Sequence, residues 1–278
     1  MITVLERIKR MDKSEITVSR VFNAIIRRIA NLPHKIMWAI PWGFAATNKR
    51  KLAEFRDLHK EKRCFVIANG PSLKKIDFEL LKDEITIGMN RIYLLEEVNG
   101  FKPTYKVCID RKSQILQFAD EYNNQTGTCF YEWDLKHKFE KKDNFIFIKS
   151  KFSTKFTKDP IAEPFGSGQS VAYTCMQLAF YMGFTEVYLI GKDHSYNTSQ
   201  KAGVGIKSTG EEDNHFIKGY YKKGQNWDVP DYKTEEFAYS LCRNAFEESG
   251  RIFRDATEGG KLEVFDKISF NSLFKKSQ

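Results

Sequence analysis

The sequence has few cysteines and no pattern that would join them. Its 278 residues include five cysteines, which is an odd number, and no CxxC pair. They mostly fall within apolar runs, where cysteine behaves as a small hydrophobic residue. This usage is typical of a protein from a reducing compartment and gives no support to a disulfide framework.

Long apolar stretches and a signal peptide are also missing. No apolar run is long enough to span a bilayer, and the first residues mix Glu6, Arg7, Lys9 and Asp12, unlike a secretory signal. Internal repeats and low-complexity tracts are absent. A hydrophobic content of 41% with 23 phenylalanines is enough for one large core. We therefore expect a cytoplasmic globular protein with one main domain and an extension.

The N-terminal extension, residues 1–63, has little acidic charge. It holds 15 Lys/Arg against 6 Asp/Glu, whereas the rest of the chain has 30 of each, so the extension carries the whole net charge of +9. Apolar residues recur at helical spacing from Val18 to Leu32, and Trp38 and Trp42 follow. Basic amphipathic helices with such tryptophans are typical of segments that bind anionic membranes.

We therefore expect the extension to hold the protein at the inner face of a membrane as a peripheral protein. The alternative is that it packs on the main domain or on a second subunit, which would make the protein a homo-oligomer. No nucleic-acid partner is expected, because neither an aromatic stacking module nor a DNA-binding motif accompanies the charge.

From Cys64 onward, apolar strands alternate with helical or turn segments, which predicts one α/β domain over residues 64–278. The predicted strands are 64–68, 85–88, 105–109, 145–149 and 186–191, with weaker candidates at 128–133 and 251–255. Helical periodicity predicts one helix from near Ser167 to Gly183 and another that Gly250 terminates. The expected fold class is a Rossmann-like α/β domain with a mostly parallel sheet flanked by helices.

Residues 193–231 form a long polar segment without a sustained period, which we call the lid segment. Its aromatic residues argue against disorder, because disordered segments are poor in them. A long loop of this kind inside a compact domain is typical of an active-site lid.

Polar residues follow the predicted strands at the end where ligands bind in α/β sheets. Asn69, Gly70 and Ser72 follow the first strand in a Gly-Pro-Ser turn, whose backbone N–H groups we expect to be unpaired and to bind a phosphate. The later strands are followed by Asn90, Arg91, Asp110, Arg111, Asp193, His194 and Tyr196. The Gly-Ser-Gly turn at residues 166–168 opens the predicted helix, whose N-terminus can hold an anion. Together these residues predict a nucleotide pocket.

Three motifs resemble known families in order and spacing: VIANGPSLKKID, TIGMNRIYL and GSGQSVAYTCMQLAFYMGFTEVYLIGKDHSY. They resemble the bacterial family-42 sialyltransferases, and equally the hydroxymethylpterin-pyrophosphokinase-like group that occurs in surface-polysaccharide gene clusters. The match covers residues 64 to about 220 in patches. The sialyltransferase resemblance implies a fold of the GT-A-variant type. It also implies transfer of a nonulosonic acid from a CMP-activated donor to a surface glycan acceptor, with no metal or other cofactor required.

The same resemblance implies roles for single residues. It places Asn69, Gly70, Ser72 and Asn90 at the CMP part of the donor, with Ser167 and Gly168 also lining the donor site. Asp110, which follows the third strand, is expected to bind the donor as well. Tyr196 would steady the leaving phosphate, since a phenol hydroxyl can do so without a metal. His215 would be the general base for the acceptor hydroxyl. If the base lies elsewhere, Asp193 and His194 are the next candidates.

Three positions depart from the sialyltransferase pattern. Pro164 stands where that family carries an arginine, and Asp110 replaces an asparagine. The family's histidine lies a few residues beyond His215, where this chain has Lys218, Gly219 and Tyr220. The assignment of His215 as the base therefore rests on the surrounding match.

Two other functions stay open. A pterin pyrophosphokinase would need Mg²⁺ held by clustered carboxylates. The chain has no Asp-x-Asp pair, but Asp110 and Asp193 could share a metal ion, so Mg²⁺ remains possible. The domain could also be a non-catalytic nucleotide-binding scaffold recruited to a membrane assembly.

Overall fold

The computed structural model describes residues 32–196 and 200–274. The chain divides into two compact units, Met1–Thr47 and Asn48–Gln278. The boundary lies within the predicted extension, because residues 48–62 belong to the second unit. In the first unit, the predicted amphipathic stretch 18–31 lies outside the described residues, and residues 32–39 are helical. Within the described residues, we find no helix with the length and apolar character needed to cross a membrane.

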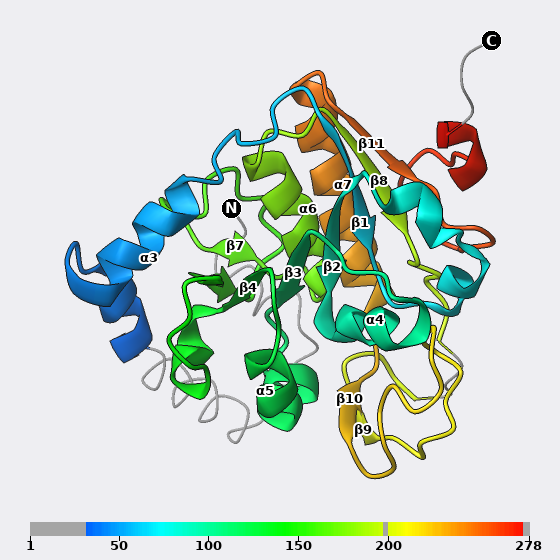
Figure 1. Ribbon diagram of the computed structural model, residues 1–278, viewed down its shortest axis with the longest axis horizontal. Helices are drawn as coiled ribbons and strands as arrows, with labels where there is room; N and C mark the ends of the chain where they lie inside the picture. Colours follow the sequence, from blue (N-terminus) through cyan, green and yellow to red (C-terminus); the bar gives the residue numbers. More distant parts are fainter. Residues whose placement is uncertain (1–31, 197–199, 275–278) are drawn as a thin grey trace, which may run out of the picture. The chain divides into compact units, whose positions relative to one another are not determined.

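The second unit is built on a seven-stranded sheet in the order β11-β8-β1-β2-β3-β4-β5 (Figure 1). Every neighbouring pair in this sheet is parallel. The strands are β1 Arg63–Ile67, β2 Ile85–Met89, β3 Tyr105–Cys108, β4 Thr128–Glu132, β5 Phe145–Ile148, β8 Glu186–Ile190 and β11 Ile252–Asp255. All seven predicted strands are therefore present, and the predicted Rossmann-like α/β fold is confirmed.

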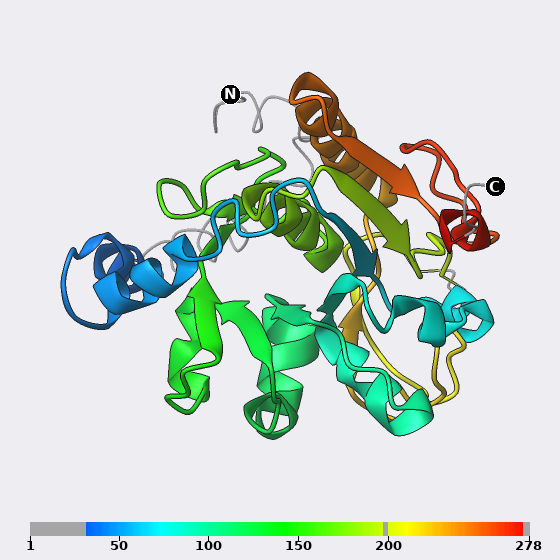
Figure 2. The same cartoon turned by 45° about the horizontal axis from the view of Figure 1, so that its top comes forward.

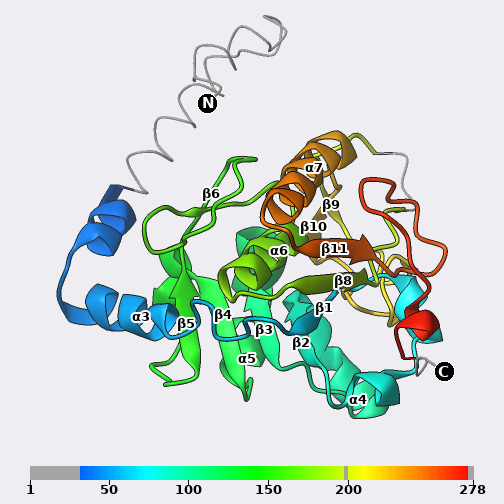
Figure 3. The same cartoon turned by 90° about the horizontal axis from the view of Figure 1, so that it is seen from above.

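Helices cover both faces of this sheet, as Figures 2 and 3 show from two directions. One face carries α6 Val171–Tyr181 and α7 Tyr232–Glu248, and the other carries α4 Leu94–Asn99 and α5 Leu116–Asn123. Buried on both sides, the central strands are continuous apolar runs such as Cys64–Ile67, which are fully buried. The helix α3 Gly43–Ala53 spans the boundary between the units, and its Asn48 pairs with both backbone groups of Phe147 on the edge strand β5.

Short elements complete the second unit. They include two small sheets, formed by β6 Ser150–Lys151 with β7 Phe165–Gly166 and by β9 Gly205–Lys207 with β10 Asn226–Asp228. The antiparallel β9–β10 pair belongs to the lid segment and lies beyond the carboxyl ends of the main strands (Figure 1). Short helical turns follow several strands: Pro71–Lys75, Phe78–Leu81, Asn90–Tyr93, Arg111–Ile115, Trp133–Lys138 and Phe270–Phe274.

The strand order defines where a ligand site is expected. The chain runs outward from β1 to β5 and then returns to place β8 on the other side of β1. The direction of the connections therefore reverses between β1 and β8. In open α/β sheets, ligands bind at such a switch point, outside the carboxyl ends of the strands.

Candidate functional site

A cavity of about 360 Å³ lies at this switch point. Its volume falls within the range of small-molecule sites, about 300–1,000 Å³. Most of the residues predicted for the site line it: Asn69, Gly70, Asn90, Asp110, Ser167, Asp193, Tyr196 and His215. The structure thus brings together, around one cavity, residues that are more than 100 positions apart in the sequence.

Two predicted site residues, Ser72 and Gly168, lie behind the cavity wall. Ser72 is buried, and both its Oγ and its backbone N–H bond the carboxylate of Asp193, with Oγ at 2.7 Å from Oδ2. Gly168 has φ +52° and packs so closely on Tyr173 that a Cβ would lie 2.5 Å from the ring. Neither residue lines the cavity: Ser72 holds Asp193, which does, and Gly168 allows the close packing of the loop on Tyr173.

The Gly-Pro-Ser turn does not offer unpaired N–H groups, which corrects the expectation drawn from the sequence. The Gly70 N–H bonds Gly191 O at 2.8 Å, Pro71 has no N–H, and the Ser72 N–H bonds Asp193. A Cβ on Gly70 would lie 1.9 Å from Asp193 Oδ2 and 2.6 Å from Gly191 O. Glycine is therefore required here because the end of β8 approaches the turn closely. The turn joins β1 to β8 across the switch point.

Asp193, which was a candidate base or metal ligand, is already hydrogen-bonded within the protein. Its carboxylate accepts from the Ser72 Oγ–H and from the Ser72 backbone N–H, which is shared between both carboxylate oxygens. In the described part of the chain, no cluster of three or more His, Cys, Asp or Glu side chains is suited to a metal ion.

Unsatisfied polar atoms surround the cavity. Asn69 is 92% buried and its Nδ2 donates to Met89 O, but its Oδ1 has no hydrogen-bond partner. Asn90 Oδ1, Ser113 Oγ and Trp227 Nε1 are likewise buried without a partner, and all three residues line the cavity. Because an unpaired buried polar atom is costly, such atoms around one cavity call for partners from outside the protein, either water or a ligand.

Asp110 follows β3 and accepts a hydrogen bond from the Ser113 N–H at 2.9 Å. Burial raises its pKa to about 6, and the charge of Asp228, which also lines the cavity, adds to the shift, while the Ser113 bond opposes it. Asp110 is therefore mostly ionised at pH 7 but takes up a proton near pH 6.

The loop before α6 differs from the expectation. The helix begins at Val171, four residues later than predicted, and Ser170 caps it by accepting the Ala172 N–H. The N–H groups of Ser167 and Gly168 are paired with the carbonyls of Lys151 and Ser153. The Gly-Ser-Gly turn is thus fixed by β6 and the loop that follows it, and does not open the helix.

The lid segment lies over the cavity and is tied to the sheet. Phe216 N–H bonds Asn69 O at 2.9 Å, and Gln117 of α5 pairs with both backbone groups of Asn226. The described aromatic residues Tyr196, Tyr220, Tyr221 and Trp227 line the cavity. These aromatic side chains contribute apolar surface to the cavity wall, as expected of a lid.

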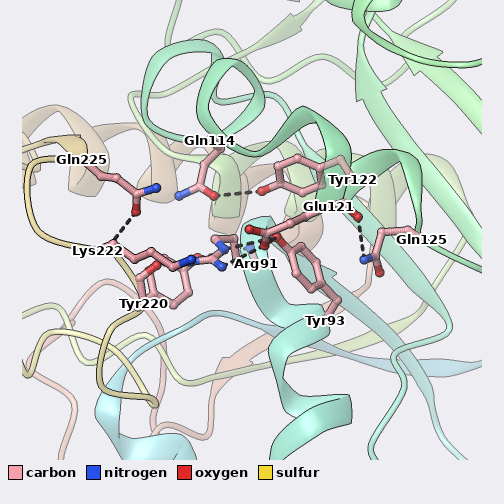
Figure 4. A network of polar contacts seen from close by, with 9 residues as sticks. All are labelled: Arg91, Tyr93, Gln114, Glu121, Tyr122, Gln125, Tyr220, Lys222 and Gln225. Atoms are coloured by element: carbon pink, nitrogen blue, oxygen red, sulfur yellow. Dashed lines mark hydrogen bonds and ion pairs between the residues drawn. The ribbon is translucent and has the colours of Figure 1, made fainter. Parts of the chain in front are cut away.

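Arg91 holds the lid segment through a network that Figure 4 shows from close by. Its guanidinium is buried, donates to Tyr220 O and bonds Glu121 Oε2 at 2.8 Å and Tyr93 Oη at 3.1 Å. The Arg91 backbone N–H also bonds Tyr220 Oη at 3.1 Å. Gln114 donates to the hydroxyl of Tyr221 and accepts from Tyr122. The sequence placed Arg91 after a strand but gave no signal for its partners.

Tyr196 and His215 belong to an aromatic cluster in the lid segment. His215 stacks on Tyr220 with ring centroids 3.9 Å apart, and Tyr196 and Tyr221 meet it edge-on. Burial lowers the pKa of His215 to about 3, and burial raises the pKa of Tyr196 to about 12. At neutral pH the histidine is therefore uncharged and the tyrosine keeps its proton.

Two charged pairs at the cavity, Lys192 with Glu235 and His194 with Glu236, were not predicted from the sequence. Lys192 bonds Glu235 of α7 at 2.8 Å, and both side chains are buried. Burial lowers the pKa of Lys192, but Glu235, Tyr239 and Tyr196 together outweigh it and the net shift is upward. His194, with φ +53°, places Nε2 2.9 Å from Glu236 Oε1. Glu235 and Glu236 lie 42 or more positions from their partners, so sequence spacing gave no signal for them.

The chain matches the model of a known protein family over more than half of its length. A model described as "MptE-like: 6-hydroxymethylpterin diphosphokinase MptE-like" matches residues 44–199, more than half of the chain. The chain belongs to the MptE-like family. Of the two groups that its motifs resemble, the pterin-pyrophosphokinase-like one is thereby shown. No curated protein matches the chain.

A solved structure shares the fold. The MAf glycosyltransferase from Magnetospirillum magneticum AMB-1 superposes with a TM-score of 0.51 at 16% sequence identity. The match covers 87% of this chain and 41% of that one, so this chain spans less than half the length of that protein. At this identity the likeness concerns the fold alone.

Proposed function

We propose that this member of the MptE-like family is a glycosyltransferase that uses a nucleotide-activated sugar. The donor is a CMP-linked nonulosonic acid, and the acceptor is a surface glycan. The observation that carries the proposal is the cavity at the switch point, where uncharged and unsatisfied hydrogen-bonding groups lie beneath an aromatic lid segment. A fold shared with a glycosyltransferase supports it.

The polar atoms suit a nucleoside. Asn69 Oδ1 and Asn90 Oδ1 are acceptors without a donor, and ribose hydroxyls and the cytosine amino group are donors. Trp227 Nε1 is a donor without an acceptor, and phosphate or carbonyl oxygens are acceptors. Binding a nucleoside here would satisfy atoms that the protein leaves buried and unpaired.

The charge of the cavity favours a donor with little phosphate charge. Among the described residues that line it, Lys192 is the only lysine or arginine, and it is paired with Glu235. The lining also includes the carboxylates of Asp110, Asp193, Asp228 and Asp231. A CMP-linked nonulosonic acid carries about two negative charges, one on its phosphodiester and one on its sugar carboxylate, whereas ATP without a metal carries about four, which these carboxylates would repel more strongly.

The family description gives the second candidate, a pterin diphosphokinase that uses ATP and Mg²⁺. Burial raises the pKa of Asp110 and the charge of Asp228 adds to the shift, so a divalent cation between the two carboxylates would relieve that repulsion. A non-catalytic nucleotide-binding scaffold would use the same cavity without turnover. The three functions differ in which nucleotide binds, in whether Mg²⁺ is needed and in whether the nucleotide is consumed.

Calorimetric titration with CMP, UDP, GDP and ATP, each with and without Mg²⁺, tests the proposal. We expect CMP to bind without Mg²⁺, and Asn69→Ala to weaken CMP binding by at least about tenfold, because one hydrogen bond to a buried group is lost. Asn99→Ala is the matched control, since Asn99 is an exposed asparagine at the end of α4. Binding of ATP with Mg²⁺ and none of CMP would favour the diphosphokinase.

We also propose that the N-terminal extension, residues 1–63, attaches the protein to an anionic membrane surface, with residues 1–47 as the part that the main fold does not need. The concentration of the whole net charge in the N-terminal segment supports this. Such attachment would place the donor site near lipid-linked or membrane-bound glycan acceptors.

A further inference from the structure

The proposed function needs a group that accepts the proton of the acceptor hydroxyl, and the inference below rests on that function. Proton transfer of this kind is the usual work of a histidine or carboxylate with a suitable pKa. Two histidines, His194 and His215, line the cavity. Their surroundings differ in ways that decide between them.

His215 is placed as a packing residue. Its ring lies face to face with Tyr220 at an interplanar angle of 2°, and the edges of Tyr196 and Tyr221 meet it within 6 Å. Its lowered pKa of about 3 makes it a weak proton acceptor at neutral pH, and the charge of Arg91 contributes to that shift after burial. The aromatic contacts explain why a histidine in this lid segment is buried.

His194 is held as a base would be held. Its Nε2 lies 2.9 Å from the carboxylate of Glu236, while its Nδ1 is buried without a hydrogen-bond partner, 3.8 Å from Glu235 Oε2. Glu235 lines the cavity and Glu236, whose side chain is half-exposed, does not. The unpartnered nitrogen therefore lies on the side of Glu235, a residue that lines the cavity, and the partnered one on the side of Glu236.

The surrounding structure fixes this orientation. His194 has φ +53°, an uncommon conformation for a residue other than glycine, directly after Asp193, which is anchored on Ser72. The ring packs against Tyr232 with centroids 4.2 Å apart. A histidine whose one nitrogen donates to a carboxylate, leaving the other free as an acceptor, has the arrangement of a base and its orienting group.

We propose that His194 is the general base of the transfer and that Glu236 positions it. The acceptor O–H gives its proton to His194 Nδ1 while the oxygen forms a bond to the anomeric carbon of the donor sugar. The bond between that carbon and the phosphate oxygen breaks, and its electron pair leaves with CMP. Burial, and then the charge of Lys192, lower the pKa of His194, whereas the two glutamates oppose this shift and stabilise the imidazolium that forms. Lys192 is itself paired with Glu235.

The test compares kcat, KM and nucleotide affinity in three variants of the full chain with CMP-N-acetylneuraminate as donor. We expect His194→Gln to lower kcat by about 10²–10⁴-fold with CMP affinity unchanged. Glu236→Gln should lower kcat by a smaller factor, because the ring stays but loses its orienting charge. His59→Gln is the matched control: His59 is also hydrogen-bonded and stacked, on Tyr105 and Phe184, away from the cavity.

A second readout separates catalysis from structure. Exogenous imidazole should restore part of the activity of His194→Ala, since a small base can occupy the vacated place. Near-normal kcat in His194→Gln together with a collapse of kcat in His215→Phe would overturn the proposal and assign the base to His215. If the unmodified protein binds no CMP, the proposed function itself fails, which is a distinguishable result.

Discussion

At the scale of single residues, the site is organised by contacts between the ends of strands. Gly70, Ser72 and Asp193 form a close contact between the ends of β1 and β8, which we call the joint. A Cβ on Gly70 would lie 1.9 Å from Asp193 Oδ2, and Ser72 Oγ lies 2.7 Å from the same atom. The sequence showed that these residues follow strands, and parallel strands place such residues together. It gave no sign that Asp193, 121 positions from Ser72, would occupy the turn's N–H group.

Gly70→Ala tests the joint. The added methyl group would overlap Asp193 Oδ2 and approach Gly191 O, so we expect a loss of at least about 2 kcal/mol in the free energy of unfolding. Urea denaturation measures it. Gly127→Ala is the control, because nothing lies within 4 Å of a Cβ there and only its positive φ adds a cost of about 1 kcal/mol. If Gly70→Ala lowers the free energy of unfolding no more than Gly127→Ala does, the close contact between Gly70 and Asp193 is contradicted.

His215 makes stability depend on pH. Its folded-state pKa of about 3 lies below the ordinary value of 6.5, so between these values the unfolded chain takes up a proton that the folded chain does not. Stability should therefore fall as pH drops from 6.5 toward 3, by up to about 1.4 kcal/mol per pH unit from this group. Asp110 acts in the opposite direction, because its pKa is raised to about 6.

His215→Phe isolates the histidine, since phenylalanine keeps the stacking on Tyr220. Denaturation of both proteins across pH 4–7 should show a flatter acid side for the variant. Parallel curves would mean that His215 takes up its proton at the same pH in the folded and unfolded chains, which contradicts the lowered pKa.

At the scale of elements, the strands other than the edge strand β11 were predictable because each is a short, mostly apolar run that is buried on both faces. The start of α6 was not, because Gly168 and Gln169 have positive φ and continue a turn that is bonded to Lys151 and Ser153. The fixing of the lid segment was not predictable either. Arg91 reaches Tyr220, 129 positions away, and no local pattern encodes that contact.

Arg91→Lys should loosen the lid segment. A lysine cannot reproduce the three-way contact with Tyr220, Glu121 and Tyr93. Since losing a buried hydrogen bond to a charged group costs about 1.5–3 kcal/mol, amide hydrogen exchange in residues 200–231 should rise by at least about tenfold. The control is Glu96→Gln, which removes an exposed ion pair with Lys102. Unchanged exchange in Arg91→Lys would show that other contacts hold the segment.

At the scale of the whole molecule, the two units predict where the chain can be divided. Residues 48–62 are hydrogen-bonded to the rest of the second unit through Asn48, Asp57 and His59. A fragment of residues 48–278 should therefore stay folded and bind CMP, whereas one of residues 64–278 should be destabilised. Thermal unfolding of both fragments checks this, and equal stability would contradict the division.

The same fragment tests the membrane proposal. The full chain should sediment with vesicles containing phosphatidylserine at low salt and be released at high salt, because each basic residue near the surface contributes about 1 kcal/mol that salt screens. The fragment of residues 48–278 should remain in solution. If the full chain also remains in solution, the N-terminal unit has another role.

The central claim is that the cavity at the switch point transfers a sugar from a CMP-activated donor. The most direct measurement is the release of CMP from CMP-N-acetylneuraminate by the full chain, without added metal, with Asn69→Ala alongside. The account predicts CMP release that depends on Asn69. It is contradicted if no CMP is released while hydroxymethylpterin and ATP with Mg²⁺ yield AMP, because the cavity would then serve diphosphate transfer.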